Sequence, residues 1–255
     1  MPLGHGRVPD DPDPRDLPHP PSPRAAKTRV DLSTWKEMPE VWDQGACNSC
    51  AVHAVAAAWE FAARRSDHPP VTLSRLFIWY QGRVRENSVA EDTGIMIRTA
   101  LKVLFSDGAP PEDVWPYNTA EYARQPSPEA YAQAPQHKAQ NYFFVKPARQ
   151  QTLLDRLKAV LADGFPISFG FQHTAELDSQ EVKRSGVLPT PNAGEHTAGD
   201  GHVALLVGYD DDTSMFKVRN SWGPEWGQQG YFTMPYGYVT SPWAGPEFWT
   251  VRLAE

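Results

Sequence analysis

The chain has 255 residues, of which 40% are hydrophobic and 11% aromatic, enough for one large core or two lobes packed together. Its formal net charge of −7 argues against a nucleic-acid partner, because such proteins usually carry a basic surface. No run of residues approaches the roughly 18 consecutive apolar residues of a membrane-spanning helix. We therefore expect neither a nucleic-acid nor a membrane partner.

Only two cysteines occur, Cys47 and Cys50, so a secreted scaffold held together by disulfides is not expected. This favours a reducing compartment, and we expect the cytoplasm. The N-terminus as written has no apolar signal-peptide core, although this leaves secretion open.

Residues 1–27 differ in composition from the rest of the chain. Eight of the 25 prolines fall within residues 1–23, mixed with Asp, His and Arg. Such a segment cannot build a core and should be extended or disordered. We assign residues 1–27 to a proline-rich extension and residues 28–255 to the folded domain.

Helices are predicted mainly in the first half of the chain. The Ala-rich segment Cys50–Arg65 has small or apolar residues on nearly every face, which indicates a buried helix. A second helix should follow, with Ser74 as its N-cap, and two later ones should each end at a glycine. These three further predicted helices span residues 73–85, 93–108 and 151–164.

The second half changes to short apolar or alternating runs bounded by Gly, Asp and Pro, which indicate strands. They span residues 165–172, 202–210, 215–222 and 230–236, with a further candidate at 248–255. Helices that precede strands, without regular alternation, predict the α+β class.

The start of the first helix carries a candidate nucleophile. Cys50 would lie at the positive end of the helix dipole, which favours the reactive thiolate. Cys47 lies in the approach loop, where we expect a free, buried thiol; a redox pair with Cys50 is the alternative. His53, one turn further on, is expected to pack or to make a structural hydrogen bond.

A nucleophilic cysteine needs a base, and the base needs a residue that orients it. His202 opens an apolar strand, and Asn220 ends the next predicted strand. A short hairpin between the two strands would place both side chains at one end of the sheet.

Three motifs together resemble those of the papain family of cysteine peptidases. They are QGACNSC (residues 44–50), GHVALLVGYD (201–210) and NSWGPEWGQQGY (220–231). The short proline-rich extension is most similar to the bacterial branch of that family. The resemblance implies an α+β fold of two lobes, with a helical left lobe, a β-sheet or barrel as right lobe, and the active-site cleft between them.

The resemblance also implies roles for individual residues. Cys50 would attack the scissile carbonyl to form a thioester acyl-enzyme, His202 would be its base, and Asn220 would orient the imidazole. Gln44 would donate to the oxyanion together with the backbone N–H of Cys50. Residues implied to bind the substrate or to cover the Asn–His contact are Thr93, Gly94, Gly201 and Trp222, the last of which is the cover.

We therefore expect a peptidase that acts on a peptide or protein substrate, without a metal or another cofactor. Walls of the substrate pockets are expected near residues 95–96, 170–171 and 195–200. Two alternatives stay open. One is an acyltransferase, amidase or peptide ligase with a narrow substrate on the same scaffold, and the other is a non-catalytic peptide-binding module.

The extension has two open interpretations. Papain-like enzymes are commonly held inactive by an N-terminal segment in the cleft, so residues 1–27 could dock on the same molecule and restrain substrate access. The charged run at residues 10–16 would then fix the register of the docked segment. The alternative is a disordered tail or linker.

Overall fold

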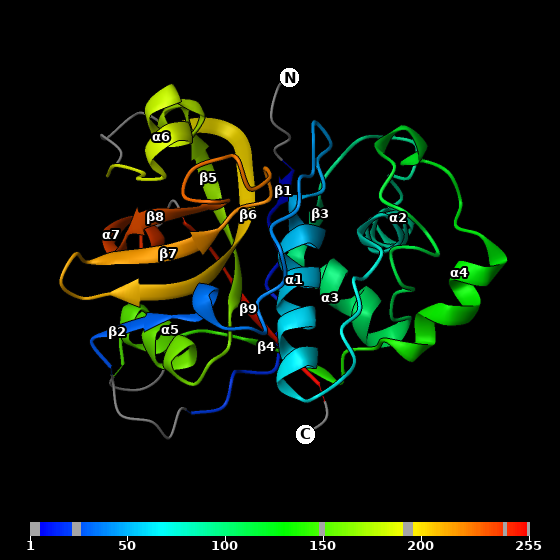
Figure 1. Cartoon of the computed structure of the whole chain (residues 1–255), viewed down its shortest axis with the longest axis horizontal. Helices are drawn as coiled ribbons and strands as arrows, with labels where there is room; N and C mark the ends of the chain where they lie inside the picture. Colours follow the sequence, from blue (N-terminus) through cyan, green and yellow to red (C-terminus); the bar gives the residue numbers. More distant parts are fainter. Residues whose placement is uncertain (1–5, 22–26, 148–150, 191–195, 242–243, 254–255) are drawn as a thin grey trace.

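The computed structural model describes residues 6–21, 27–147, 151–190, 196–241 and 244–253. Expectations that fall on residues 1–5, 22–26 and 195 therefore lie outside the described part. Figure 1 shows two lobes, one built of helices and one built on a large sheet, which we call the helical lobe and the sheet lobe. Within the described ranges, no helix combines the length and apolar character needed to cross a membrane.

Helix α1 (Cys50–Arg65) lies where the helical lobe meets the sheet lobe (Figure 1), and its bounds match the predicted helix. Its alanines are buried and allow close approach of neighbouring elements on several sides. Ser74 accepts a hydrogen bond from the backbone N–H of Phe77 and so caps the next helix as predicted. The remaining helices of the lobe are α2 (Arg75–Arg85), α3 (Ile97–Ser106), α4 (Pro128–Gln133), η2 (Thr119–Glu121) and η3 (Ala134–Gln136).

Helix α3 begins four residues later than the predicted start at Thr93. The cause is a short strand, β3 (Ile95–Met96), which comes directly before the helix and pairs with another segment of the chain. Pairing with a distant segment thus overrides the local helical preference.

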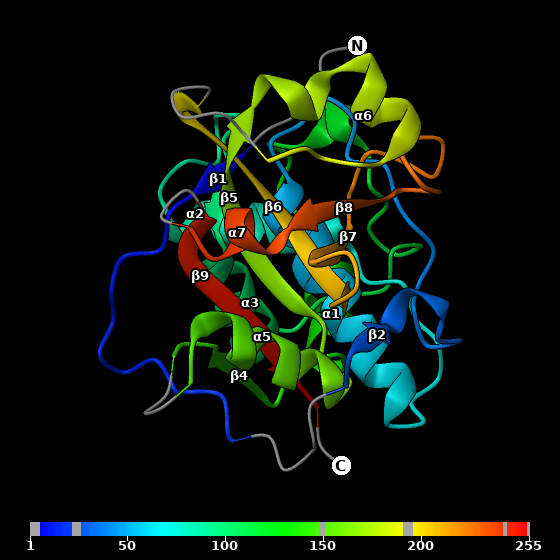
Figure 2. The same cartoon turned by 90° about the vertical axis from the view of Figure 1, so that its left-hand side faces the viewer.

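The sheet lobe contains a seven-stranded sheet in the order β4-β9-β5-β6-β7-β8, and β2 pairs with β6 as well. Helix α1 packs on this sheet from the helical lobe, and α5 (Leu153–Ala162) packs on β5 and β6 (Figures 1 and 2). The strands are β2 (Arg29–Asp31), β4 (Asn141–Phe144), β5 (Ile167–Thr174), β6 (His196–Asp210), β7 (Met215–Arg219), β8 (Tyr231–Pro235) and β9 (Ala244–Arg252). Smaller elements of the lobe are η1 (Leu32–Thr34), η4 (Ala175–Asp178), α6 (Gln180–Ser185) and α7 (Tyr236–Val239).

The register of the β6–β7 hairpin positions two candidate residues. Leu205 pairs with Arg219, so His202, three residues before Leu205, lies at the same end of the hairpin as Asn220. His202 also pairs with Phe171 of β5, which fixes the other side of its strand. The sheet thereby holds both residues toward α1.

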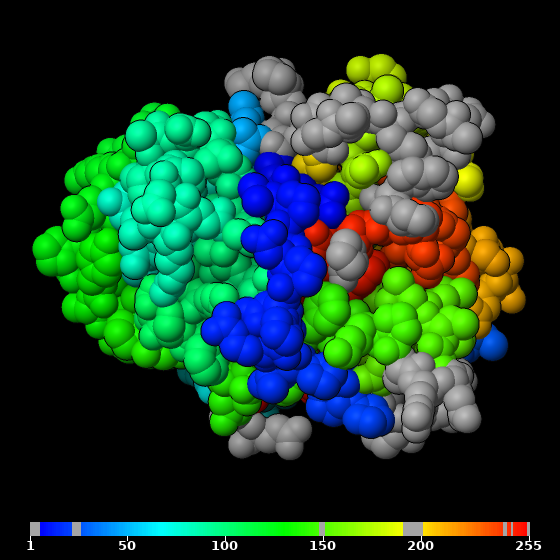
Figure 3. Space-filling model, turned by 180° about the vertical axis from the view of Figure 1, so that it is seen from behind, coloured from blue at the N-terminus to red at the C-terminus, as the bar shows by residue number. Residues whose placement is uncertain are grey.

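Residues 6–21, which we call the arm, pack along the boundary between the lobes. Its strand β1 (Arg7–Val8) pairs in parallel with β3. Figure 3 shows the arm in blue, filling the groove between the helical lobe and the sheet lobe. Further along, Leu17 and His19 exchange backbone hydrogen bonds with Phe144 of β4, at 2.8 Å each.

Arg98 at the start of α3 fixes the acidic part of the arm. Its Nε and Nη2 donate to the two carboxylate oxygens of Asp16 at 3.0 and 2.6 Å, and its Nη1 donates to the Asp11 carbonyl at 2.6 Å. Asp10 accepts from the backbone N–H of Arg98 and from Trp249 Nε1 of β9. The arm is therefore attached to both lobes.

Candidate active site

Cys50 is the first residue of α1 and is completely buried. Ser49 is the N-cap but makes no side-chain capping bond, so the first turn leaves backbone N–H groups directed at the thiol. Hydrogen bonds from the backbone amides of Val203, Gly6, Ala51 and Cys50 itself reach the sulfur. The contact with Val203 brings the strand that carries His202 next to the thiol.

His202 and Asn220 meet at the end of the β6–β7 hairpin. His202 Nε2 donates to Asn220 Oδ1 at 2.8 Å, because a carboxamide oxygen can only accept. The same oxygen accepts from the backbone N–H of Ser221 at 2.9 Å. Both side chains are buried, and the Trp222 ring lies over the imidazole with centroids 4.7 Å apart and planes tilted by 33°. The hydrogen bond is thus oriented and kept away from water.

Gln44 is held on the helical side of the site. Its Nε2 donates to the Cys47 carbonyl at 2.7 Å, and its Oε1 accepts from Ser221 Oγ at 2.5 Å. Its backbone carbonyl accepts from Tyr117 Oη at 3.0 Å. The side-chain amide is therefore fixed beside the first turn of α1, and Tyr117 and Ser221 are supporting residues that the motif did not reveal.

Two of the residues predicted to bind the substrate, Gly94 and Gly201, lie against the arm. An ideal Cβ on Gly94 would lie 1.5 Å from the Gly6 carbonyl oxygen, so only glycine allows the arm to pass. Trp79 Nε1 donates to the Thr93 carbonyl at 3.0 Å and holds that segment in place. An ideal Cβ on Gly201 would lie 2.8 Å from Arg7 Cβ. Thr93–Gly94 and Gly201 therefore border one path, which Gly6 and Arg7 occupy.

The protonation of Cys50 differs from the expectation. The sequence favoured a thiolate at the helix N-terminus, but burial raises the pKa of the Cys50 thiol to about 11. The hydrogen bonds from the surrounding amides, including that of Gly6 in the arm, lower this pKa, and desolvation by burial outweighs them. Cys47 is also a free, buried thiol, with a pKa raised to about 11 by burial and by the nearby Asp92.

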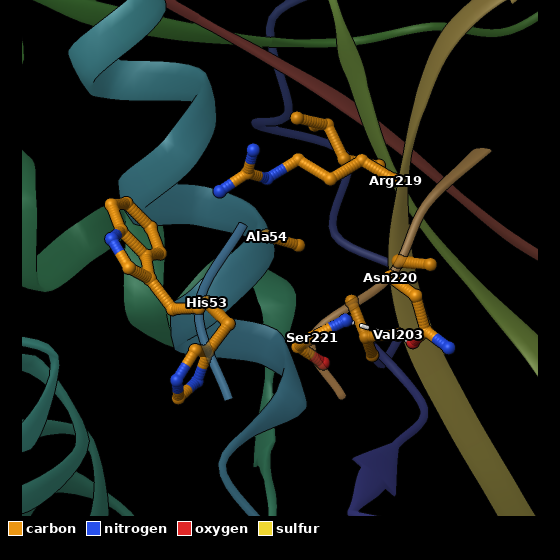
Figure 4. A pocket seen from close by; sticks show the side chains of 9 residues that line it. His53, Ala54, Val203, Arg219, Asn220 and Ser221 are labelled. Carbon is orange, nitrogen blue, oxygen red and sulfur yellow. Dashed lines mark hydrogen bonds between the residues drawn. The ribbon is translucent and has the colours of Figure 1, made fainter. Parts of the chain in front are cut away.

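A narrow cavity lies behind the site, between α1 and the β6–β7 hairpin (Figure 4). His53 lines it and bonds the Ser49 carbonyl through Nδ1 at 3.0 Å, while burial holds its pKa well below the usual value. A neutral, hydrogen-bonded His53 fits the structural role expected for it. The other residues around this cavity are Trp42, Ala54, Val203, Ala204, Leu205, Arg219, Asn220 and Ser221.

No group of three or more His, Cys, Asp or Glu within the described ranges could hold a metal ion. Sequence reasoning also missed one charged pair near the thiol. Arg7 of the arm forms an ion pair with Glu247 of β9, 240 positions away in the chain. A lone Glu in a late strand gives no local signal for such a contact.

Comparison with known proteins identifies the family. The model described as papain family cysteine protease matches residues 26–241, most of the chain. The chain belongs to the papain family of cysteine proteases. The family and the α+β two-lobe fold predicted from the motifs are thereby confirmed.

Individual relatives of this papain-family protease agree. The crystal structure of Xylellain, a cysteine protease from Xylella fastidiosa, superposes with a TM-score of 0.90 at 34% identity, covering 99% of this chain and 97% of that one. An uncharacterized peptidase C1-like protein of Acanthamoeba polyphaga mimivirus is 37% identical over 82% of this chain and 68% of its own length. Mouse pro-cathepsin H is 26% identical over 77% of this chain, which spans only 56% of that relative.

The buried thiol leads to a first prediction, on alkylation by iodoacetamide. In the intact chain, Cys50 should react slowly at neutral pH, because its raised pKa keeps it protonated and the arm covers it. Deleting residues 1–27 restores solvent and removes desolvation, so the pKa should fall and the midpoint of the rate–pH curve should move below the free-thiol value of ~8.5. Mass mapping of each cysteine follows the reaction.

Cys47 provides the internal control, since the side chains that shift its pKa, Asp92, Arg83 and Thr119, all lie outside the arm. Its reaction rate should change little on deletion. An unchanged midpoint for Cys50 would contradict the assignment of its protonation to the arm.

Proposed function

We propose that this protease hydrolyses peptide bonds through a triad of Cys50, His202 and Asn220. The observation that carries the proposal is the 2.8 Å hydrogen bond between His202 and Asn220. His202 lies on β6, and the backbone amide of the next residue, Val203, contacts the Cys50 thiol. These contacts support an arrangement in which nucleophile, base and orienting residue are neighbours, as nucleophilic catalysis requires.

The reaction begins when the arm has left and a peptide occupies its path. With Nε2 committed to Asn220, Nδ1 of His202 takes the thiol proton. The thiolate sulfur bonds to the carbonyl carbon, and its oxygen becomes an oxyanion. The Gln44 side-chain amide and the backbone N–H of Cys50 donate to this oxyanion. Each such donor typically contributes ~10²–10³-fold in rate.

Collapse of this intermediate breaks the C–N bond, and the imidazolium of His202 protonates the departing amine. The acyl group stays on Cys50 as a thioester. Water then attacks the thioester carbon while His202 accepts a proton, and the thiol is regenerated as the acid product leaves. Asn220 and Trp222 keep the imidazole in one orientation through both halves of the reaction.

The nucleophile is tested by comparing two cysteine variants. Cys50→Ala should reduce kcat/KM on a short fluorogenic peptide to background, because alanine has no sulfur to attack the carbonyl carbon. Cys47→Ala, the matched control three residues earlier in the loop before α1, should keep most of the activity. Loss of turnover in Cys47→Ala with activity retained in Cys50→Ala would refute the proposal.

Asn220 is tested through the separation of kcat from KM. Asn220→Ala removes the acceptor of the imidazole N–H, so kcat should fall by roughly 10²-fold with a smaller change in KM, because the loss concerns the transition state. Asn141→Ala on the outer strand β4 serves as control. A kcat unaffected by Asn220→Ala would remove the residue from the mechanism.

We also propose that the arm restrains access to this site. Gly6 and Arg7 lie on the path bordered by Gly94 and Gly201, and Cys50 is completely buried beneath them. A peptide substrate needs the same space. The arm must therefore leave before substrate can bind. Its hydrogen bonds and ion pairs with the two lobes set the fraction of molecules in which the site is open.

Weakening those attachments should raise activity. Arg98→Ala breaks a mostly buried, bidentate ion pair with Asp16, and loss of such a pair costs on the order of 3 kcal/mol. We expect a higher kcat/KM for Arg98→Ala and the highest for deletion of residues 1–27. Arg85→Ala, which breaks the Asp107 pair between two helices, is the matched control and should leave kcat/KM unchanged. Equal kcat/KM in all four proteins would refute the restraint.

A further inference from the structure

The hydroxyl group of Tyr117 lies next to the loop that leads into α1, and it comes from a segment outside the three motifs. Tyr117 Oη donates to the Gln44 carbonyl at 3.0 Å and lies 2.5 Å from Ser49 Oγ. Ser49 is the residue directly before Cys50. A single oxygen atom therefore joins two points of the loop before the nucleophile assigned above.

The hydrogen bonds of this hydroxyl have a defined direction. A carbonyl oxygen can only accept, so the phenol proton is directed at Gln44. Ser49 Oγ must then donate to Tyr117 Oη. His53 does not compete for the Ser49 proton, because its Nδ1 donates to the Ser49 carbonyl at 3.0 Å and carries a proton of its own. The result is a directed chain of hydrogen bonds from Ser49 through Tyr117 to Gln44.

The two ends of this chain belong to the two groups that would donate to the oxyanion in the proposed reaction. The Ser49 carbonyl and the Cys50 N–H are parts of one planar peptide unit, so fixing Ser49 also fixes the direction of that N–H. Gln44 supplies the other donor, its side-chain amide. Tyr117 thus links the residue before one donor to the residue that carries the other.

The side chain of Ser49 is directed at Tyr117 and not at the helix. As the N-cap of α1, Ser49 could accept a hydrogen bond from the backbone N–H of Ala51 or Val52, but it makes no side-chain capping bond. The start of the helix therefore gives up a contact that normally stabilises it. What the Ser49 hydroxyl provides is its link to Tyr117.

Tyr117 is itself held from several sides. Its backbone N–H donates to Glu112 Oε1 at 3.0 Å, and Glu112 is paired with Arg75 of α2. The Arg75 guanidinium lies 5.0 Å from the centre of the Tyr117 ring, and His53 of α1 meets the ring edge to face with centroids 5.0 Å apart. Burial raises the pKa of the Tyr117 phenol, so the hydroxyl keeps its proton at neutral pH. The phenol is therefore a fixed point beside the loop.

We propose that Tyr117 is a positioning residue for the oxyanion donors, whose hydroxyl keeps the Cys50 N–H and the Gln44 side-chain amide at the separation that the tetrahedral intermediate needs. This inference rests on the proposed peptidase function and adds to it a residue from outside the motifs. Tyr117 acts through Ser49 and Gln44 and not on the reacting atoms.

The test uses the full chain with Arg98→Ala as the parent, because the arm should open more often in it. Tyr117→Phe keeps the ring and removes the hydroxyl. We expect kcat on a short fluorogenic peptide to fall by roughly 10-fold with little change in KM, less than the ~10²–10³-fold for loss of a whole donor. Tyr131→Phe is the matched control, since its hydroxyl donates to Gln81 at 3.1 Å in the same lobe, and it should leave kcat unchanged.

A second variant addresses the link between the two residues. Ser49→Ala removes the other end of the same hydrogen bond, and it should not weaken the start of α1, because Ser49 makes no side-chain capping bond. We expect kcat to fall in this variant as well. The double variant should be no slower than Tyr117→Phe alone, because both changes break one link and their costs do not add.

Alkylation of Cys50 by iodoacetamide separates positioning from general damage to the site. This reaction displaces iodide at a saturated carbon and forms no oxyanion. Its rate should therefore be the same in Tyr117→Phe as in the parent, although kcat differs. A merely structural role of Tyr117 would slow both reactions.

Three results overturn the inference. They are an unchanged kcat in Tyr117→Phe, costs of Tyr117→Phe and Ser49→Ala that multiply in the double variant, and an alkylation rate that falls together with kcat. Each would leave Tyr117 as a packing residue of the helical lobe. Failure of the peptidase proposal itself looks different, because the Arg98→Ala parent and the chain without residues 1–27 would then both cleave no peptide.

Discussion

The relative position of the two lobes at the site depends on one contact between two loops. The backbone N–H of Gln44 donates to the Ser221 carbonyl at 2.8 Å, and Ser221 Oγ donates back to the Gln44 side chain at 2.5 Å. Asp43 and Trp222 form a β-bridge beside them. One loop leads into α1 and Cys50, and the other follows directly from Asn220. This contact therefore joins the loop before Cys50 to the residue that directly follows Asn220.

The same contact gives Gln44 and Ser221 two structural roles each. Gln44 is at once a side chain of the site and part of the joint between the lobes, and Ser221 connects it to Asn220. A change at either residue would alter the spacing between sulfur and imidazole as well as the local hydrogen bonds. In a packed, buried site, a displacement of ~1 Å can cost as much rate as loss of a functional group.

Much of the framework of the candidate site could be predicted from the sequence, because it is encoded locally. The alanines of Cys50–Arg65, the Ser74 cap and the apolar run before Asp210 each specify their element from neighbouring residues. The motifs then placed Cys50 at the start of the first helix and His202 in the apolar strand, and Asn220 directly follows the next strand, β7. What lay beyond prediction was non-local: β3 depends on pairing with the arm, and the pKa of the Cys50 thiol depends on its burial and on hydrogen bonds from distant segments.

The ion pair of Glu247 was likewise not predictable from local sequence. Its partner Arg7 lies at the other end of the chain, and the glycines around the pair come from three different strands. None of these residues is unusual within its own segment, and only the folded sheet brings them together. A cluster formed by long-range pairing becomes visible only once strand order and register are known.

The arm is covalently part of the molecule whose groove it fills, so under the proposed restraint it would compete with substrate as a tethered ligand. A tethered ligand acts at an effective concentration of about millimolar when its linker is short, however dilute the protein is. Diluting the enzyme therefore does not release the arm, and a free peptide must reach comparable concentrations to displace it. Proline-rich segments also lose little conformational entropy on docking. Occupancy of the cleft is thus a property of the single chain, set by intramolecular equilibrium and independent of how many copies are present.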